Sequence, residues 1–247
     1  MLLEDIKSFT LSITKRPINP RKAYNIWAEI YDSGDDNLVF QMEEKILNSL
    51  IKNIDLSGKS ILDYGCGTGR NWEKLISYKP NKITGCDVSI KMLQQLQSKY
   101  PGSEIYLIKN SSEFPVQLGT IDIIFSTLVI AHIKDLKKTF REWNRLLKPG
   151  GIILITDLHP AILSAGGKRI FEKDGKSIAI KNYIHSIDKI KILCDAFNWE
   201  VAGFEESFIS EETKIFYEKK NALNIYERFY GLPLVYGILI RKLNGIN

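Results

Sequence analysis

Cysteine is scarce in this chain. Only three occur among the 247 residues, Cys66, Cys86 and Cys194, and no two of them form a CxxC pair. An odd number of widely separated cysteines encodes neither a disulfide framework nor a zinc cluster. We therefore expect no metal centre and a protein that works in a reducing cytoplasm.

Long hydrophobic runs are also missing. No window approaches the roughly 18 uninterrupted apolar residues that a membrane-spanning helix requires. The first residues include Glu4 and Asp5, where a secretory signal peptide would be basic. Both observations predict a soluble, cytoplasmic protein without a membrane partner.

Charge of one sign is not concentrated in any tract. The 34 lysines and arginines are interspersed with 29 acidic residues, which leaves a net charge of +5. A charge of this size is typical of a solvated surface and only weakly suggests an anionic partner. A basic groove with interleaved aromatic residues is not evident, so the sequence does not favour a nucleic-acid partner.

What is present fits one α/β domain. With 44% hydrophobic residues the chain can bury one large core. A helical pattern occupies 22–52 and is broken at Asp32-Ser33-Gly34. Beyond residue 58, short apolar segments rich in β-branched residues alternate with amphipathic helices, which implies right-handed crossovers and a parallel sheet covered on both faces. The predicted strands are 61–64, 83–86, 105–108, 121–126 and 152–156, and the helices include 89–99, opened by Ser89, and 135–147, opened by Asp135.

The alternation is interrupted after residue 157. Asp174-Gly175 separates two short runs and predicts a hairpin, followed by a helix at 186–198 and strands at 200–209 and 233–241. Insertions at the carboxyl ends of parallel strands commonly cover ligand crevices, although a plain surface elaboration gives the same pattern. We therefore divide a single domain into an N-terminal helical cap (1–57), a core (58–157), a hairpin lid (158–185) and a C-terminal helix with strands (186–247).

A glycine-rich loop follows the first predicted strand in ILDYGCGTGR, residues 61–70. A phosphate loop needs GxxxxGK[ST], and this segment has neither that spacing nor the lysine. A dinucleotide fingerprint needs GxGxxG, but the position three residues after Gly67 is Arg70, and the third glycine is Gly69. Asp63, just before the loop, suits a cationic group of a ligand better than a pyrophosphate.

DYGCGTG resembles the first motif of class I S-adenosylmethionine-dependent methyltransferases, and residues 22–157 are similar to their type 11 group. Asp87 lies 22 residues after Gly65, where the family has an acidic residue that binds the ribose hydroxyls. The segments NSSEFP, IDIIFSTLVIAHIKD and LLKPGGIILI follow in the family's order. The resemblance implies a doubly wound, Rossmann-like α/β fold with a seven-stranded sheet, mostly parallel with an antiparallel last strand. It also implies S-adenosylmethionine as cofactor and S-adenosylhomocysteine as product.

The resemblance further implies a set of cofactor-binding residues. Asp63 and the carbonyl of Gly65 would accept hydrogen bonds from the cofactor's amino group, and Tyr31 and Arg70 would bind its carboxylate. Asp87 would hold the ribose. The remaining expected residues are Val88 and Met92 around the adenine, Asn110 where the family usually has aspartate, Ser111 through its backbone N–H, and Cys66, Gly67, Gly69 and Ser126.

Only three histidines are available as a general base, which an oxygen or protonated nitrogen acceptor would need. His159, after the fifth predicted strand, is the first candidate, and orienting the turn before Pro160 is the alternative. His132 resembles a family position that borders the cofactor pocket or holds a loop. His185 fits a hydrogen-bonding role at a helix start, and Asp157 could orient His159.

Missing motifs narrow the methyl acceptor. Methyltransferases acting on exocyclic base amines or glutamine usually carry [DN]PP[FYW] after the fourth strand, where this chain has Ser126-Thr127-Leu128, and no cysteine is available there for RNA cytosine methylation. We therefore expect methylation at oxygen or nitrogen of a small metabolite. The alternatives are a macromolecular acceptor such as tRNA or a peptide, and a cofactor-binding homologue without turnover. The aromatic residues that could line an acceptor pocket are Tyr24, Trp27, Tyr31, Phe171, Tyr183 and Tyr230.

Overall fold

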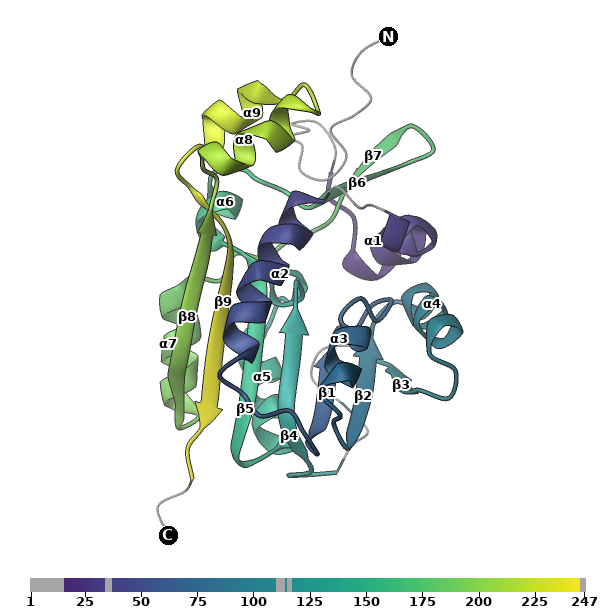
Figure 1. The fold of residues 1–247 in the computed structure, drawn as a ribbon, viewed down its shortest axis with the longest axis vertical. Helices are drawn as coiled ribbons and strands as arrows, with labels where there is room; N and C mark the ends of the chain where they lie inside the picture. The colour runs from purple at the N-terminus through teal and green to yellow at the C-terminus, as the bar shows by residue number, and fades with distance from the viewer. Residues whose placement is uncertain (1–15, 34–36, 110–113, 115–116, 245–247) are drawn as a thin grey trace.

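The computed structural model describes residues 16–33, 37–109, 114 and 117–244. A seven-stranded sheet in the order β3-β2-β1-β4-β5-β9-β8 forms its centre (Figure 1). The strands are β1 (Ser60–Tyr64), β2 (Lys82–Asp87), β3 (Glu104–Leu107), β4 (Ile121–Thr127), β5 (Leu147–Leu158), β8 (Trp199–Phe208) and β9 (Pro233–Lys242).

The strand directions confirm the predicted Rossmann-like sheet. Strands β3, β2, β1, β4 and β5 pair in parallel, while β9 runs antiparallel to both of its neighbours, β5 and β8. The final strand of the chain is therefore the antiparallel one. Chain order reverses between β1 and β4, and ligands of open parallel sheets bind at such a point, outside the carboxyl ends of the strands.

Helices cover both faces of this sheet, as the near-continuous apolar strands require. Successive residues of β5 point to opposite sides, so that Leu154 joins a cluster with α2 (Leu38–Ile51), while Ile153 and Ile155 join a cluster with α5 (Leu136–Leu146) and α7 (Ile187–Ala196). Figure 1 shows α2 in front of the sheet and α5 and α7 behind it. The short α3 (Trp72–Ser77) and α4 (Ile90–Lys99) share a smaller cluster beside β2.

Three predicted helix starts are confirmed by their capping bonds. The side chain of Ser89 accepts from the N–H of Met92 at 3.2 Å, and Asp135 accepts from Lys138 at 3.1 Å. Ser186 opens α7 in the same way. Each cap satisfies a backbone donor that the first helical turn leaves unpaired.

The N-terminal helices and the hairpin lie together. The helix α1 (Pro20–Trp27) continues into the 3-10 helix η1 (Ala28–Ser33), and the predicted hairpin is formed by β6 (Ile170–Lys173) and β7 (Lys176–Ala179). The rings of Trp27 and Phe171 stack 4.7 Å apart, and Ile18 forms a parallel bridge with Ile180. The lid prediction thus corresponds to a hairpin packed on α1.

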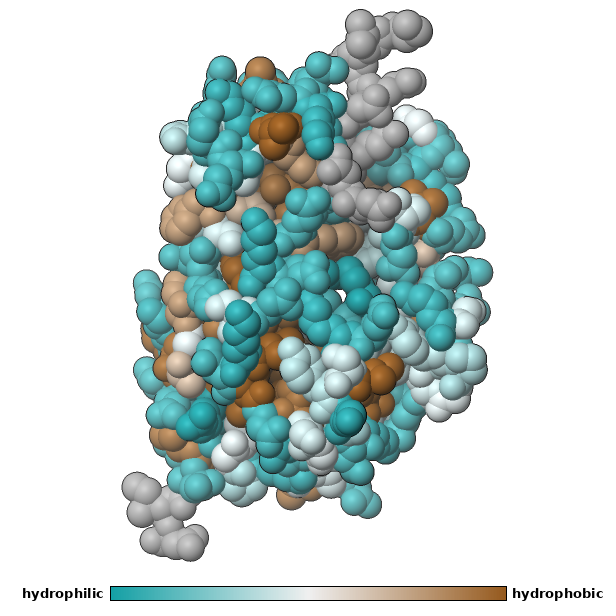
Figure 2. Space-filling model, viewed as in Figure 1, coloured by the Kyte–Doolittle hydropathy of each residue, from teal (hydrophilic) through white to brown (hydrophobic). Residues whose placement is uncertain are grey.

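Three further helices were not predicted: α6 (Pro160–Ser164), α8 (Glu211–Glu218) and α9 (Leu223–Phe229). The start of α8 carries a capping box, in which Ser210 and Thr213 bond reciprocally, so Ser210 followed by two glutamates was an available signal. Figure 2 shows a largely hydrophilic face with hydrophobic side chains gathered in small, separate areas. No described helix is long and apolar enough to span a membrane.

Candidate functional site

A cavity of about 590 Å³ lies at the carboxyl ends of β1, β2 and β4, beneath α1. The glycine loop supplies Gly65 and Gly67, and the turn after β2 supplies Asp87 and Val88. The other lining residues are Asn19, Pro20, Arg21, Tyr24, Tyr31, Tyr64, Met92, Ile108, Lys109, Thr127, Leu128, Val129, His132, Ile133 and Lys134.

The glycine loop brings bare backbone to this cavity. Gly65 and Gly67 have φ values of +80° and +53°, a region that residues with a Cβ rarely adopt. A Cβ at Gly65 would collide with Val129, whereas the space beside Gly67 is open to 4 Å. Glycine is thus required at the first position by packing and conformation, and at the second by conformation alone.

The backbone N–H groups of Gly65, Cys66 and Gly67 are used within the protein. The N–H groups of Gly65 and Cys66 both donate to the carbonyl of Cys86, at 2.8 and 3.0 Å, and that of Gly67 donates to the Asp87 carboxylate at 3.0 Å. A phosphate-binding loop needs such N–H groups free to face the anion. This loop therefore suits a ligand that presents hydrogen-bond donors or positive charge, and it disfavours a phosphate.

Asp87 closes the turn between β2 and α4 and lines the cavity. Its Oδ2 accepts from Gly67, and its Oδ1 accepts from the N–H of Ser89 at 2.7 Å. Burial raises the pKa of this carboxyl to about 6, against the effect of its backbone donors. Each carboxylate oxygen has a further lone pair, so Asp87 can still accept from the hydroxyls of a ligand.

Asp63 lies below the loop and does not line the cavity. Its Oδ2 accepts from the indole N–H of Trp72 at 2.8 Å, and the residue is only 4% exposed. Burial raises the pKa of this carboxyl to about 7. Its observed role is to fix the helix that follows the loop.

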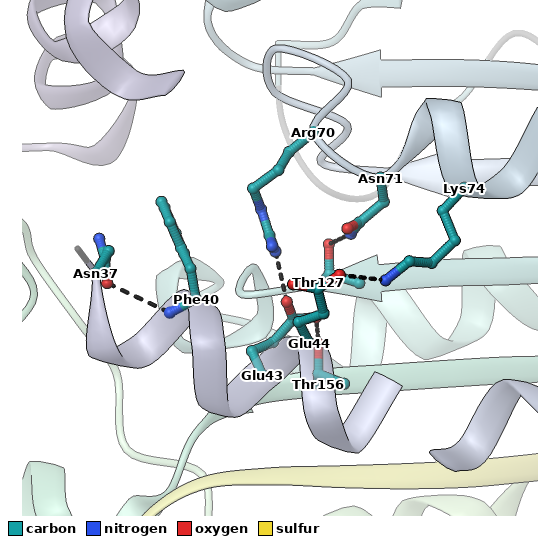
Figure 3. Close-up of polar contacts among 9 residues, drawn as sticks. All are labelled: Asn37, Phe40, Glu43, Glu44, Arg70, Asn71, Lys74, Thr127 and Thr156. Carbon is teal, nitrogen blue, oxygen red and sulfur yellow. Dashed lines mark hydrogen bonds and ion pairs between the residues drawn. The ribbon is translucent and has the colours of Figure 1, made fainter. Parts of the chain in front are cut away.

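Arg70 also points away from the cavity, toward α2 (Figure 3). Its guanidinium donates to Glu43 at 2.6 Å and lies 4.6 Å from the centre of the Phe40 ring. Glu43 is fully buried, and its other oxygen accepts from the hydroxyl of Thr156 at 2.7 Å. Arg70 lines a second cavity of about 710 Å³ on the other side of the loop, together with Gly69 and Tyr31.

A tyrosine–histidine pair faces the first cavity. The Tyr24 hydroxyl lies 2.9 Å from Nε2 of His132, and Nδ1 of His132 lies 3.1 Å from the carbonyl of Lys181. A carbonyl can only accept, so Nδ1 carries the proton and Nε2 accepts from Tyr24. Burial lowers the pKa of His132 to about 4 and raises that of Tyr24, so both groups are neutral at pH 7.

The loop that carries His132 is held on both sides. Asp157, at the end of β5, accepts from the N–H of Ala131 at 2.8 Å, and the N–H of Tyr183 donates to the carbonyl of Ala131 at 2.6 Å. His185 donates through Nε2 to the carbonyl of Ile133 at 2.8 Å. These contacts fix the position of the His132 ring and leave Asp157 and His185 with structural roles.

His159 lies outside both cavities. Its Nδ1 accepts from the N–H of Ala161 at 3.0 Å and caps α6, while Nε2 lies 2.8 Å from Glu206. The Asp157 carboxylate binds Ala131 and Leu158, so it does not orient this histidine.

The cavity thus brings together seven of the expected residues: Tyr31, Gly65, Gly67, Asp87, Val88, Met92 and His132. It does not bring Asp63, Arg70 or His159 to the same place, nor Cys66, Gly69 and Ser126. Asn110 and Ser111 lie outside the described residues. Among the described residues, no group of three or more His, Cys, Asp or Glu side chains could hold a metal ion.

Comparison with known proteins identifies the family. A methyltransferase domain matches residues 62–155. An uncharacterized methyltransferase of Emericella nidulans is 30% identical over a 224-residue alignment that covers 74% of this chain and 75% of the relative. The chain belongs to the class I S-adenosylmethionine-dependent methyltransferases.

Two other matches cover different shares of this methyltransferase. The malonyl-[acyl-carrier protein] O-methyltransferase of Hamiltonella defensa is 27% identical over 147 residues, and the match covers 60% of this chain but only 55% of that enzyme. A chain from the complex between the Haloferax volcanii Trm112 methyltransferase activator and a methyltransferase has a TM-score of 0.67 at 17% identity, covering 92% of this chain and 98% of its own. Because its sequence identity is low, the second match shows a similar fold and nothing more.

Several hydrogen-bond and ion-pair partners in this methyltransferase were not predicted from the sequence. Tyr24 was expected only as an aromatic wall residue, but its hydroxyl pairs with His132. Glu43 lies on the apolar face of α2 between Met42 and Ile46, and an acidic residue at such a position signals a buried partner, here Arg70. Trp72, the donor to Asp63, had no comparable signal.

Proposed function

We propose that this enzyme transfers the methyl group of S-adenosylmethionine to an oxygen or nitrogen atom of a small molecule. The observation that carries the proposal is the juxtaposition, in one cavity, of the glycine loop with Asp87 and of the Tyr24–His132 pair. A volume of about 590 Å³ falls within the range of roughly 300–1,000 Å³ typical of small-ligand pockets.

The cofactor would occupy the side formed by the glycine loop, Asp87, Val88 and Met92. When bound, it supplies a methyl group on a sulfonium, an electrophile that needs no activation by the protein. Asp87 accepts from the ribose hydroxyls, and the open space beside Gly67 admits the ligand against the backbone. Val88 and Met92 offer apolar contact to the adenine. Because the N–H groups of Gly65, Cys66 and Gly67 are already bonded within the protein, the loop fits a ligand with an ammonium and a sulfonium better than a pyrophosphate.

Tyr24 and His132 would orient the acceptor on the opposite side. The Tyr24 hydroxyl donates to Nε2 and keeps its lone pairs for an O–H or N–H group of the acceptor. Methylation of a neutral oxygen makes its proton strongly acidic. The proton can then pass to the Tyr24 oxygen while the Tyr24 proton passes to Nε2. Because burial keeps the pKa of His132 near 4, the imidazole is neutral and ready to accept before the reaction.

The position of the cavity favours a small acceptor over a macromolecule. It lies beneath α1, bounded by Tyr24 and Tyr31, and the guanidinium of the exposed Arg21 is bonded to the carbonyl of Lys109 at 2.5 Å. The relative from Hamiltonella defensa acts on a malonyl group carried by a protein, so a small acceptor attached to a carrier is the nearest variant.

Incubation with methyl-labelled S-adenosylmethionine and fractionated cell extract tests the proposal. We expect label in the low-molecular-mass fraction. We also expect the rate of labelling to fall when Tyr24→Phe replaces the wild-type protein. Label found only in RNA or only in protein would overturn the small-molecule assignment.

A further inference from the structure

Three exposed cations line the first cavity without acidic partners. They are Arg21 at the start of α1, Lys109 just after β3, and Lys134 in the loop that carries His132. The guanidinium of Arg21 donates to the backbone carbonyl of Lys109 at 2.5 Å, which brings two of these residues together. Within the part of the chain that the structure describes, every ion pair joins other side chains.

The second cavity has the opposite arrangement. Its three cations each form an ion pair at 2.6 to 2.9 Å: Arg70 with Glu43, Lys74 with Glu44, and Lys99 with Asp32. The protein therefore neutralises the positive charge of the second cavity by itself. In the first cavity the positive charge remains available to a ligand.

Most of the net charge of the chain lies in the segments that line the first cavity. These segments are 19–24, 31, 64–67, 87–92, 108–109 and 127–134, and they hold five lysines and arginines but one acidic residue, Asp87. The rest of the chain holds 29 basic and 28 acidic residues. A net charge of +5 that is dispersed along the sequence is thus gathered by the fold around one site.

The cofactor does not account for this positive charge. S-adenosylmethionine has one carboxylate and two positive centres, so a cavity that bound the cofactor alone would be expected to carry negative charge. Among the described lining residues the one anion is Asp87, and its oxygens already accept from Gly67 and Ser89. A positive lining attracts anionic ligands from solution, and here the remaining ligand is the methyl acceptor.

We propose that the methyl acceptor carries a net negative charge, in a group separate from the methylated atom, and that Lys109 and Lys134 bind this group at the exposed side of the cavity. This inference rests on the proposed function. Lys134 follows His132 by two residues on the same loop, so an anion bound there lies close to the Tyr24–His132 pair. A lysine ammonium binds carboxylate and phosphoryl groups alike, as a point charge.

The charge of the labelled product provides the first test. The low-molecular-mass product formed with methyl-labelled S-adenosylmethionine is applied to an anion-exchange resin at pH 7.5. We expect the resin to retain the label and to release it with salt, because methylation leaves the anionic group intact. Loss of retention after phosphatase treatment would identify a phosphate monoester, and unchanged retention would identify another anion such as a carboxylate. Label that passes through the untreated resin would overturn the proposal.

The second test removes the two lysine charges. Lys109→Gln/Lys134→Gln keeps the bond from Arg21, because that bond uses the backbone carbonyl of residue 109. The matched control is Lys52→Gln/Lys219→Gln, which removes two exposed lysines that line neither large cavity.

A dilution series of the unlabelled extract fraction that the resin retains gives relative KM values. We expect Lys109→Gln/Lys134→Gln to raise the KM for the acceptor about tenfold, with kcat nearly unchanged. The KM of the wild type should also rise with ionic strength, and this dependence should be weaker in that double variant. The control should behave like the wild type. Equal KM values for the two double variants would overturn the proposal.

The location of the label and the binding of S-adenosylhomocysteine separate this inference from the proposed function. Lys109→Gln/Lys134→Gln should keep the wild-type Kd for S-adenosylhomocysteine, because the glycine loop and Asp87 are intact. A wild-type protein that transfers no label to the low-molecular-mass fraction contradicts the proposed function itself. Label in an unretained small molecule contradicts only the anionic acceptor.

Discussion

The hydroxyl of Tyr24 lies 2.9 Å from Nε2 of His132, although the two residues are 108 positions apart in the chain. The contact joins α1 of the N-terminal cap to the loop after β4, directly at the cavity. It therefore couples the position of the cap to the position of the imidazole. The arrangement makes the pair testable without knowledge of the acceptor.

Tyr24→Phe should lower the rate of methyl transfer to the labelled small-molecule fraction by roughly 10- to 100-fold, because it removes the hydroxyl that relays and orients the acceptor. The Kd for S-adenosylhomocysteine should change little, since the ring is kept. Tyr230→Phe, on the half-exposed ring at the end of α9, is the control and should behave like the wild type. Equal rates for Tyr24→Phe and Tyr230→Phe would remove Tyr24 from the mechanism.

Binding of S-adenosylhomocysteine should weaken as the pH falls below about 6. The pKa of Asp87 is raised to about 6 in the free protein, and ribose hydroxyls donate best to the ionised form. We expect the association constant to be flat above that pH and to fall about tenfold per pH unit below it. Titration calorimetry measures this slope.

The raised pKa of Asp87 affects folding stability in the opposite direction: a lower pH weakens ligand binding but stabilises the folded protein. Burial disfavours the ionised carboxyl, so the contribution of Asp87 to the free energy of unfolding increases as the pH falls from about 6 toward 3.8, the ordinary pKa of an aspartate.

Asp87→Asn should weaken S-adenosylhomocysteine binding by about 1.5–3 kcal/mol and remove the pH dependence of that binding. Asp122→Asn, near the amino end of β4 and bonded to Lys148, should keep it. A slope retained in Asp87→Asn would assign the titration to another group.

The Arg70–Glu43 and Lys74–Glu44 pairs join α2 to the same segment but differ in burial (Figure 3). Breaking the buried pair with Arg70→Met should lower the free energy of unfolding by about 3–5 kcal/mol, because Glu43 is left uncompensated. Lys74→Met breaks the exposed pair and should cost at most about 1 kcal/mol. Denaturant unfolding compares them, and similar losses would contradict the structural role given to Glu43.

His159→Ala should lower the free energy of unfolding by about 1 kcal/mol, because the side chain caps α6. Both S-adenosylhomocysteine binding and methyl transfer should be retained, since His159 lines neither large cavity. A rate reduced well beyond the loss of folded protein would return His159 to the mechanism as a base.

The sequence predicted local features well where one residue type has one physical role. Strands buried on both faces, the caps at Ser89, Asp135 and Ser186, and the turn at Asp174-Gly175 all follow from chemistry within a few residues. The family resemblance supplied the antiparallel direction of the last strand, which local patterns alone could not.

Side-chain direction was less predictable than position. Asp63 and Arg70 flank the glycine loop in the sequence, but Trp72 and Glu43 draw them away from the cavity. Those contacts depend on how α2 and α3 pack, which no local pattern encodes.

A crystal structure with S-adenosylhomocysteine bound tests the position of the cofactor and of the Tyr24–His132 pair together. We expect the adenosyl group in the cavity lined by Gly67 and Asp87, with the ribose hydroxyls bonded to the Asp87 carboxylate. The sulfur atom should face Tyr24 at a distance that leaves room for a methyl group and an acceptor atom, about 5 Å from sulfur to the acceptor atom. Density for the ligand in the second cavity, beside Lys74 and Lys99, or a sulfur atom directed away from Tyr24 and His132, would contradict it.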